Sequence, residues 1–496
     1  MWMIRQIGIR ALRIAVPFFC VLTVAHAQDR EDTRRMLEMN VQRQAADRER
    51  DLLQNETAVP AGSTITIDGQ TWQVEHSTPA VGQALYLSLQ SQQWPEAQRF
   101  LDEYLTFADR DPLLVHYAQG LLARQRGAFS QSVAEFTALL NRQPGFLPAR
   151  LELARTLFED GQEREADNVF TETLDSIDAS DPKTAGVRKS VGLFRDALAQ
   201  RQAWTGAFAF GPEWTDNVNR TSASQTCLLS ISGQCYYERT LPKAISTTGT
   251  GFDASVQRRI PIWQHHGFYL RSQLFGTQYR THGDYNETTF STQAGYSYRK
   301  GRHQIAVAPT FEYYDLGNHA FYGAWGAHAE WSYLQGSSSL LKLEGDYKEM
   351  RYRQKLYAEN FDGGQSSVYA TYYRDVGAGL TLFGGIDFVD STAEDKVNAY
   401  QQKGMRLGAS VALPAGLQAT VFSAYRQRDY GMYSPLLEMR RRDKEQNYTL
   451  VLKAAEWKVA GFVPLLTVRH NRVKSNVDWL YSYDRNDVSL KLEYAF

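Results

Sequence analysis

Residues 487–496, at the end of the chain, read DVSLKLEYAF. Apolar side chains alternate with small or polar ones up to the terminal phenylalanine. A period of two places the two sets on opposite faces of a β-strand. One face is apolar and the other polar, which fits a soluble sheet or a strand between lipid and a water-filled lumen. The apolar positions are Val488, Leu490, Leu492, Tyr494 and Phe496.

The same alternation recurs from Trp204 onward, for example in QIAVAPTFEY (304–313), LLKLEGDYK (340–348) and LTLFGGIDF (380–388). One face of these segments carries many charges, and the other carries aromatic and aliphatic residues, which is unusual for a soluble sandwich. The pattern predicts fourteen strands. They are expected at 204–215, 248–260, 265–281, 287–299, 303–314, 319–334, 339–352, 365–375, 379–390, 401–413, 416–429, 444–455, 458–472 and 485–496.

The connections between these strands alternate in length. Tight turns such as KG, QGSS, VGAG and PAG follow even-numbered strands, and longer polar stretches such as 216–247 and 430–443 follow odd-numbered ones. Short turns on one side and long loops on the other are typical of an outer-membrane barrel. The last strand must then pair with the first, because lipid does not tolerate an open sheet edge. The alternating terminal strand ending in Phe496 also resembles the signal by which the barrel-assembly machinery recognises its clients.

The first 27 residues predict a secretory signal peptide. Three arginines and no acidic residue precede an apolar run that ends in Ala25-His26-Ala27, so cleavage is expected between Ala27 and Gln28. The apolar run is too short to span a bilayer. Removing three arginines takes the formal net charge from −1 to −4, which argues against a nucleic-acid partner.

Two cysteines remain in the processed chain, Cys227 and Cys235, in the segment CLLSISGQC. Outside the cytoplasm, an even pair within one polar loop predicts a disulfide. Two free thiols are the alternative. A metal site would need more ligands than this loop offers.

The front half of the chain contains a repeat of 34 residues. Gly120 aligns with Ala154, Gly127 with Gly161 and Phe136 with Phe170, always at an offset of 34. That spacing and these residue types are those of the tetratricopeptide repeat, in which two helices form each unit. A weaker copy precedes them, and a final helix is expected to cap the array.

These observations predict the fold class: an N-terminal α-helical tetratricopeptide-repeat solenoid followed by a C-terminal 14-stranded antiparallel transmembrane β-barrel. Residues 29–58 are densely charged and are expected to form a solvated helix or a mobile arm, and TITIDGQTWQV (64–74) predicts a hairpin. The expected domains are 1–27 (signal peptide), 28–77 (charged arm and small hairpin), 78–202 (repeats at about 78–111, 113–146 and 147–180, with a capping helix at 183–202) and 203–496 (barrel).

Tetratricopeptide arrays usually bind a polypeptide in a concave groove lined by the first helix of each repeat. The candidates here are Tyr117, Leu121, Arg124, Leu151, Arg155 and Phe158. Ordinary core packing is the alternative for each of them.

The sequence carries little sign of catalysis. It has no phosphate-binding Walker A loop, no H-E-x-x-H and no C-x-x-C, and its ten histidines are scattered. No enzyme activity, cofactor or metal is therefore expected. The run Arg440, Arg441 and Arg442 is interpreted as part of a solvated outer loop.

The combination of ITIDGQTW, LVHYAQGLLARQRG, PARLELARTLFEDGQEREADNVF and GPEWTDNVNRTS, the last opening a fourteen-strand barrel, resembles the Slam family of surface lipoprotein assembly modulators. The resemblance covers essentially the whole processed chain. It implies export of particular proteins across the outer membrane, with the repeats in the periplasm. Implied clients are surface lipoproteins or secreted proteins that acquire haem or iron. The resemblance supplies no catalytic residues.

A folded client is too large for the expected pore. A domain of about 100 residues has a radius of gyration near 13 Å, whereas even sixteen-strand porins pass only small solutes. The client is therefore expected to cross unfolded, or through a lateral opening between the first and last strands. Outer-membrane lipid, the barrel-assembly machinery and periplasmic chaperones are further expected partners of a monomeric protein. Two rival functions remain: an exopolysaccharide export porin with periplasmic helical repeats, and a passive porin with a periplasmic adaptor.

Overall fold

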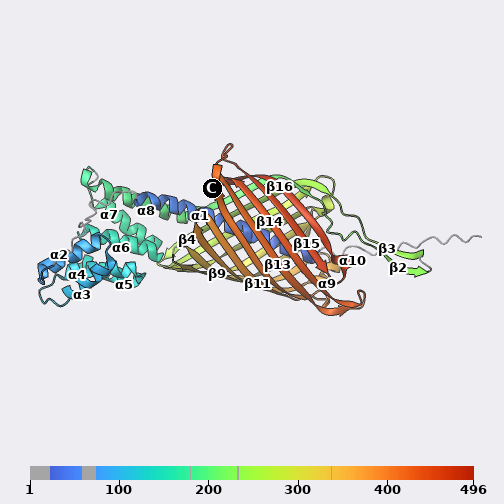
Figure 1. Cartoon of the computed structure of the whole chain (residues 1–496), viewed down its shortest axis with the longest axis horizontal. Coiled ribbons are helices and arrows are strands. Elements are labelled where there is room, and N and C mark those ends of the chain that lie inside the picture. The colour runs from blue at the N-terminus through green and yellow to red at the C-terminus, as the bar shows by residue number, and fades with distance from the viewer. Residues whose placement is uncertain (1–22, 58–73, 179, 232–233, 337) are drawn as a thin grey trace, which may run out of the picture.

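The computed structural model describes residues 23–57, 74–178, 180–231, 234–336 and 338–496. Fourteen antiparallel strands form a closed barrel in which β1 pairs with both β4 and β16 (Figure 1). The predicted fold class is confirmed, and each of the fourteen predicted strands overlaps one barrel strand. The barrel strands are β1 (Thr205–Thr215), β4 (Thr247–Trp263), β5 (His266–Tyr279), β6 (Glu287–Lys300), β7 (His303–Leu316), β8 (His319–Gln335), β9 (Ser339–Tyr352), β10 (Gly363–Gly377), β11 (Leu380–Ser391), β12 (Tyr400–Leu413), β13 (Leu417–Ser434), β14 (Met439–Ala454), β15 (Val463–Ser475) and β16 (Tyr483–Ala495).

The alternation in the sequence decides which side chains face outward. On β16, Leu490 is 54% exposed, whereas the neighbouring Ser489 is 7% exposed. On β11, Ile386 is 66% exposed and Asp387 is 4% exposed. The barrel therefore presents apolar side chains on its outer surface and encloses polar ones, as a strand between lipid and a wet lumen requires.

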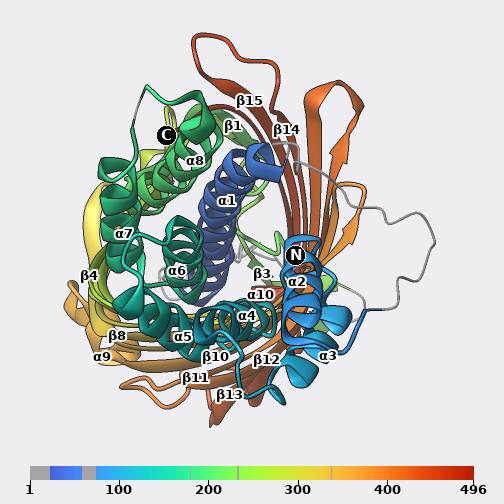
Figure 2. The same cartoon turned by 90° about the vertical axis from the view of Figure 1, so that its left-hand side faces the viewer.

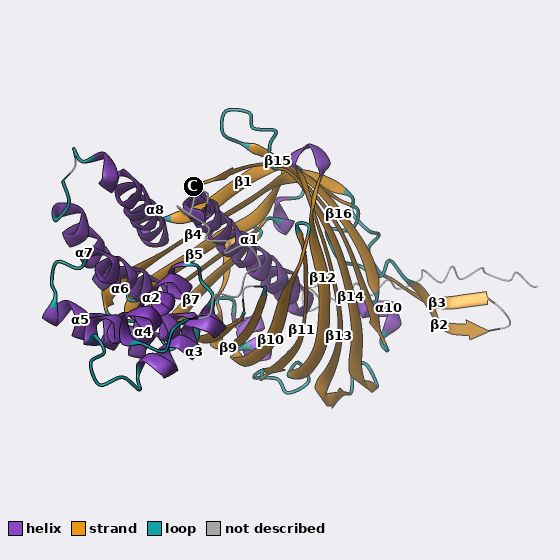
Figure 3. Ribbon diagram, turned by 60° about the vertical axis from the view of Figure 1, so that its left-hand side comes forward, coloured by secondary structure: helices purple, strands orange, loops and turns teal. Residues whose placement is uncertain are grey.

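The two ends of the barrel differ. At one end the loops carry a hairpin of β2 (Gln225–Ile231) and β3 (Gln234–Thr240) and the short helices α9 (Lys355–Phe361) and α10 (Asp478–Tyr481). The predicted disulfide between Cys227 and Cys235 is present in this hairpin. Figure 3 shows the hairpin at the far end from the helical domain.

One predicted loop is shorter than expected, because β13 and β14 extend into residues 430–443. The arginine run therefore lies on β14 and is not simply solvated. The Arg441 guanidinium lies 3.4 Å from the centroid of the Tyr481 ring and pairs with Asp443 at 2.6 Å. Arg442 pairs with Asp429.

The helical domain consists of paired antiparallel helices followed by one further helix (Figure 2). Gly120 allows close packing, since a Cβ atom there would lie 2.7 Å from the Phe136 ring. Gly161 ends its helix in the left-handed conformation, at a φ of 85°. The helices are α2 (Thr78–Gln90), α3 (Trp94–Tyr104), α4 (Pro112–Gln125), α5 (Phe129–Arg142), α6 (Leu147–Asp160), α7 (Glu163–Asp175) and α8 (Ala185–Gln202).

The charged N-terminal segment differs from its expectation. It forms α1 (Thr23–Thr57), which runs inside the barrel and emerges beside α8 (Figures 1 and 2). The segment is helical, but much of it is enclosed by the barrel and is not solvated. The signal peptide lies largely outside the described residues, as does the predicted hairpin at 64–74. The expected cleavage site, Ala27–Gln28, falls near the start of α1.

Within the described part of the chain, no helix is both long enough and apolar enough to cross a bilayer.

Candidate functional site

The lumen of the barrel is occupied by α1, which contacts the wall mainly through charged and polar groups. Arg35 pairs with Glu344 on β9 at 2.7 Å, and its guanidinium lies 3.2 Å from the centroid of the Tyr369 ring on β10. Arg43 donates hydrogen bonds to Ser410 on β12 and Thr381 on β11, at 2.5 and 2.8 Å. Arg30 donates a hydrogen bond to Tyr322 on β8 at 2.9 Å, and Glu38 pairs with Arg271 on β5 at 3.6 Å, so the contacts of α1 extend from β5 to β12.

The most buried of these contacts joins Asp32 of α1 to Arg426 of β13. Arg426 donates two hydrogen bonds to the Asp32 carboxylate, at 2.7 and 2.8 Å, and a third to Asp387 on β11. The Arg426 side chain is 1% exposed. A bidentate contact fixes the rotation and depth of the helix as well as adding attraction.

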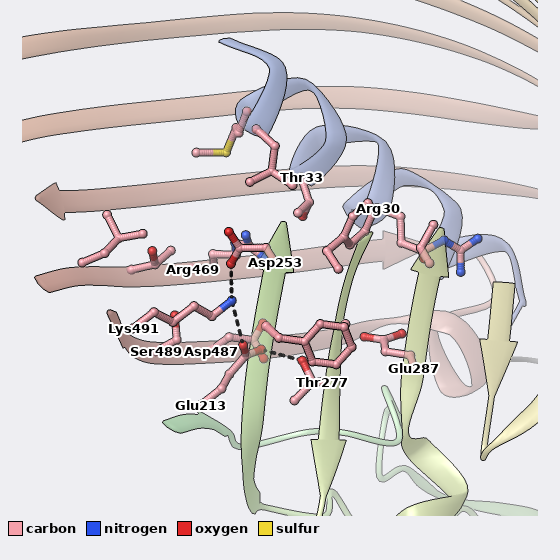
Figure 4. A pocket seen from close by; sticks show the side chains of 18 of the residues that line it. Arg30, Thr33, Glu213, Asp253, Thr277, Glu287, Arg469, Asp487, Ser489 and Lys491 are labelled. Atoms are coloured by element: carbon pink, nitrogen blue, oxygen red, sulfur yellow. Dashed lines mark hydrogen bonds and ion pairs between the residues drawn. The ribbon is translucent and has the colours of Figure 1, made fainter. Parts of the chain in front are cut away.

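Near the junction of β1 and β16 the lumen retains a cavity of about 110 Å³, bordered by α1 and by strands on both sides of this junction. Figure 4 shows Lys491 of β16 between Asp253 of β4 and Glu213 of β1, at 2.9 and 3.7 Å. Glu213 also accepts a hydrogen bond from Thr277 at 3.3 Å. At 110 Å³ the cavity accommodates a few water molecules but not an extended polypeptide.

The other end of α1 leaves the barrel and packs against the last helices of the repeat domain. Leu52 and Leu53 contact the apolar core that contains Phe158. Arg201 of α8 pairs with Glu49 at 2.6 Å and lies 3.8 Å from the centroid of the Phe158 ring. Burial acts to raise the pKa of Glu49, but the hydrogen bond and charge of Arg201 lower it below its usual value.

The turn between α6 and α7 docks on the short turns of the barrel. Glu163 is 1% exposed and accepts hydrogen bonds from Arg259 and Arg299, each at 2.8 Å. His265, in the turn between β4 and β5, contacts Asp160 at 2.8 Å. The repeat domain is therefore joined to the barrel mouth by ionic and hydrogen-bonded contacts.

The predicted groove residues fall into two groups. Leu121 and Phe158 are buried in the repeat cores, and Tyr117 and Leu151 pack against those cores, Tyr117 edge-on to Phe136. These four side chains support the solenoid itself.

The two arginines of the predicted groove form a charged network between repeats. Arg124 pairs with Glu152 and Glu159 of the next repeat, and Arg155 pairs with Glu152 at 2.8 Å. Burial acts to lower the pKa of Arg124, but Glu159 and Glu152 raise it above its ordinary value. This network is the polar part of the predicted groove that the structure brings together.

The pairing of β1 with β16 closes the barrel, but this pairing is interrupted in the middle of the two strands. Residues 207–210 pair with 492–495 and residues 213–215 with 487–489, while Gly211 and Pro212 are unpaired on this side. Proline has no N–H to donate. Pro309 leaves a similar gap between β6 and β7, so the gap alone does not single out this junction. The residues of the predicted assembly signal face outward here and are exposed.

The position of α1 inside the lumen is the feature of the site that the sequence did not reveal. The charges of α1 are spaced for a helix, and the barrel strands carry matching charges on their inner face. This complementarity is the signal that could have been used. Among the described residues, no group of three or more histidine, cysteine or acidic side chains is placed to hold a metal ion.

Two family models match the chain. The model described as "Surface lipoprotein assembly modifier" covers residues 204–496, and the model described as "Surface lipoprotein assembly modifier, N-terminal TPR repeats" covers residues 67–170. The chain belongs to the surface lipoprotein assembly modifier family. The resemblance drawn from the sequence is confirmed. The family descriptions name an assembly modifier and not an enzyme.

Relatives of this family match over most of their length. The chain is 37% identical to the hemophilin secretion modulator of Acinetobacter baumannii over 87% of this chain and 89% of the relative. It is 25% identical to surface lipoprotein assembly modifier 1 of Haemophilus influenzae, with 80% and 81% covered. It is 24% identical to surface lipoprotein assembly modifier 1 of Neisseria meningitidis serogroup B, with 88% and 86% covered.

Family membership and the apolar outer surface together establish the location of the assembly modifier. The barrel lies in the outer membrane, and the repeats lie in the periplasm at the barrel mouth that has the short turns. The hairpin of β2 and β3 is then on the cell surface.

Proposed function

We propose that this chain exports a client protein from the periplasm to the cell surface through its barrel. The observation that carries the proposal is the ionic docking of a peptide-binding type of repeat domain on the periplasmic mouth of the barrel, in a member of the assembly modifier family. The relatives named for surface lipoproteins and for hemophilin secretion support a protein as cargo rather than a polysaccharide. No catalytic role is proposed.

The repeats recognise the client, or a chaperone that delivers it. The charged network of Arg124, Glu152, Glu159 and Arg155 suits a polar, extended segment. The client is a surface lipoprotein or a secreted protein of the hemophilin kind, and it crosses without its folded structure, because the lumen is narrow and occupied. The barrel-assembly machinery inserts the exporter, reading the outward-facing residues of β16.

Surface display tests this function. The chain and hemophilin are expressed together in a host that lacks both, and intact cells and medium are probed with antibody and protease. We expect hemophilin at the surface or in the medium only when this chain is present. Hemophilin retained in the periplasm beside a folded, inserted barrel would contradict export of this client by the chain.

The route through the barrel is tested by locking its junction. A disulfide in the variant A207C/A495C would join β1 to β16, since these residues are paired there. The control A207C/S255C joins β1 to β4, where these residues are also paired. Loss of export only with the first lock supports a lateral opening. Unchanged export with both locks assigns the passage to the lumen.

A further inference from the structure

The two halves of α1 are attached to the rest of the molecule by different kinds of contact. Inside the barrel, its contacts are mainly ion pairs and hydrogen bonds, from Arg35 to Glu344 and from Asp32 to Arg426. Met39 adds an apolar contact with Phe383 and Phe422. Outside the barrel, Leu52 and Leu53 pack against the apolar core of the last repeat.

This difference determines which attachment can be reversed. A charged helix and a charged wall can both be solvated after they separate, and a buried ion pair adds little net stability because desolvation offsets its attraction. Apolar side chains that leave a core lose burial with no compensating interaction. Separation therefore costs less at the lumen wall than at α8.

The repeat domain is also joined to the barrel by separable contacts. Glu163 binds Arg259 and Arg299, and Asp160 binds His265. A displacement of the repeats would break these contacts and carry α1 along, because Leu52 and Leu53 of α1 pack on the apolar core of the last repeat.

We propose that α1 is a retractable plug that closes the export passage at rest and leaves the lumen together with the repeat domain when a client is taken up. The proposal rests on the proposed function. It assigns the coupling to the packing of α1 on the last repeat and the closure to the contacts of α1 with the barrel wall, from Arg271 on β5 to Arg426 on β13. The cavity of about 110 Å³ lies in a part of the lumen that α1 leaves open at rest.

The closure is tested without a client, by the ionic conductance of the purified full chain in a planar lipid bilayer. The variant R34E/R35E places negative charge opposite Asp346 and Glu344, so we expect α1 to leave the wall and the conductance to rise at least tenfold. The control R48E/R50E reverses two charges on the same helix nearer its periplasmic end and should conduct as the natural chain does.

A compensating change distinguishes a lost plug from a damaged barrel. Adding E344R and D346R to R34E/R35E restores opposite charges between α1 and the wall, and the conductance should fall well below that of R34E/R35E. The variant E344R/D346R alone is the matched control, because Glu344 and Asp346 also pair with Lys342 and His328. Protease cleavage of α1 reports whether the helix has left the lumen. An R34E/R35E barrel that conducts no better than the natural chain, although α1 is cleaved, would overturn the proposal, and so would a leak that the compensating changes do not close.

The coupling is tested by crosslinking during export of hemophilin. A bismaleimide bridge in R43C/S410C fixes α1 to the barrel wall, and the matched control is the same variant with both cysteines blocked by N-ethylmaleimide. We expect the bridged chain to export far less than the blocked one. Export that continues with α1 fixed to the wall overturns the plug. Failure of the natural chain to export in the same cells contradicts the proposed function instead.

Discussion

Phe170 in the repeats and Arg426 in the barrel are both almost completely buried, at 0% and 1% exposed, but their surroundings are opposite. Phe170 stacks on Phe194, with ring centroids 5.3 Å apart, inside an apolar core. Arg426 is surrounded by the carboxylates of Asp32 and Asp387. The repeat domain has an apolar interior, as soluble proteins do. The barrel has a polar interior and an apolar outer face, because lipid covers that face. Burial in the repeat domain therefore means apolar packing that is costly to break, whereas burial in the barrel lumen means ionic contacts whose partners can be solvated after they separate.

The largest effect is expected in the apolar core. Replacing Phe170 by alanine removes a fully buried ring and should destabilise the repeat domain by about 3–5 kcal/mol. The measurement is thermal unfolding of the purified chain, followed by the circular dichroism of its helices. The barrel should keep its resistance to heat in detergent. Replacing the partly exposed Tyr86 instead should change little, and equal losses for the two variants would contradict the core assignment.

The next effect concerns the ionic contact in the lumen. Replacing Asp32 by alanine leaves Arg426 without its main partner and should weaken the closure of α1 by about 3 kcal/mol. Replacing both residues by alanine should cost less than the two single changes together, because no charge remains unpaired. Protease susceptibility of α1 in increasing urea measures the closure. Additive losses would show that these two side chains do not interact.

The disulfide is expected to act locally. It closes a loop with a sequence separation of 8, so its removal in C227S/C235S should destabilise the surface hairpin by about 2–3 kcal/mol on loop entropy alone. Protease should then cut the hairpin on intact cells, while the barrel stays folded and hemophilin export is unchanged. A loss of barrel assembly would show that the hairpin also stabilises the barrel, which would contradict this expectation.

The smallest effect is a dependence on pH at the periplasmic end of α1. The pKa of Glu49 is lowered in the folded chain, so its pairing with Arg201 contributes fully above the usual glutamate pKa. This contribution, about 1 kcal/mol, is lost as the pH falls through the lowered value. Fluorescence energy transfer between labels on α1 and α8 should report loosening in acid. In E49Q the same transfer should not change with pH in this range.

The sequence predicted the barrel well because each strand carries its own signal. Ser489 and Leu490 show the alternation within two residues, and fourteen such strands overlap those of the structure. It did not predict the location of α1, because the partners of that helix are distant in the chain, with Asp32 and Arg426 separated by 394 positions. The sequence of a charged helix has the same pattern whether water or a charged lumen surrounds the helix.

The predicted groove was ambiguous for a related reason. Leu121 and Phe158 each lie on the first helix of a repeat, which serves the core and the groove alike, and the structure buries both. The arginines were the better guide, since Arg124 and Arg155 lie in the network between repeats. The sequence analysis did not predict that β14 extends back through Arg441. The residues at this end of the strand are charged on both faces, so they lack the alternation of apolar and polar side chains that marks the other strands.

The most direct test of the account is photocrosslinking at two neighbouring positions of β16 during export. Ser489 faces the lumen beside the cavity, and Val488 faces outward toward lipid. A photoreactive amino acid is placed at each position in turn, and cells exporting hemophilin are illuminated. The account predicts crosslinks to hemophilin from position 489 and far fewer from position 488. Export without crosslinks from position 489 would contradict passage through this barrel.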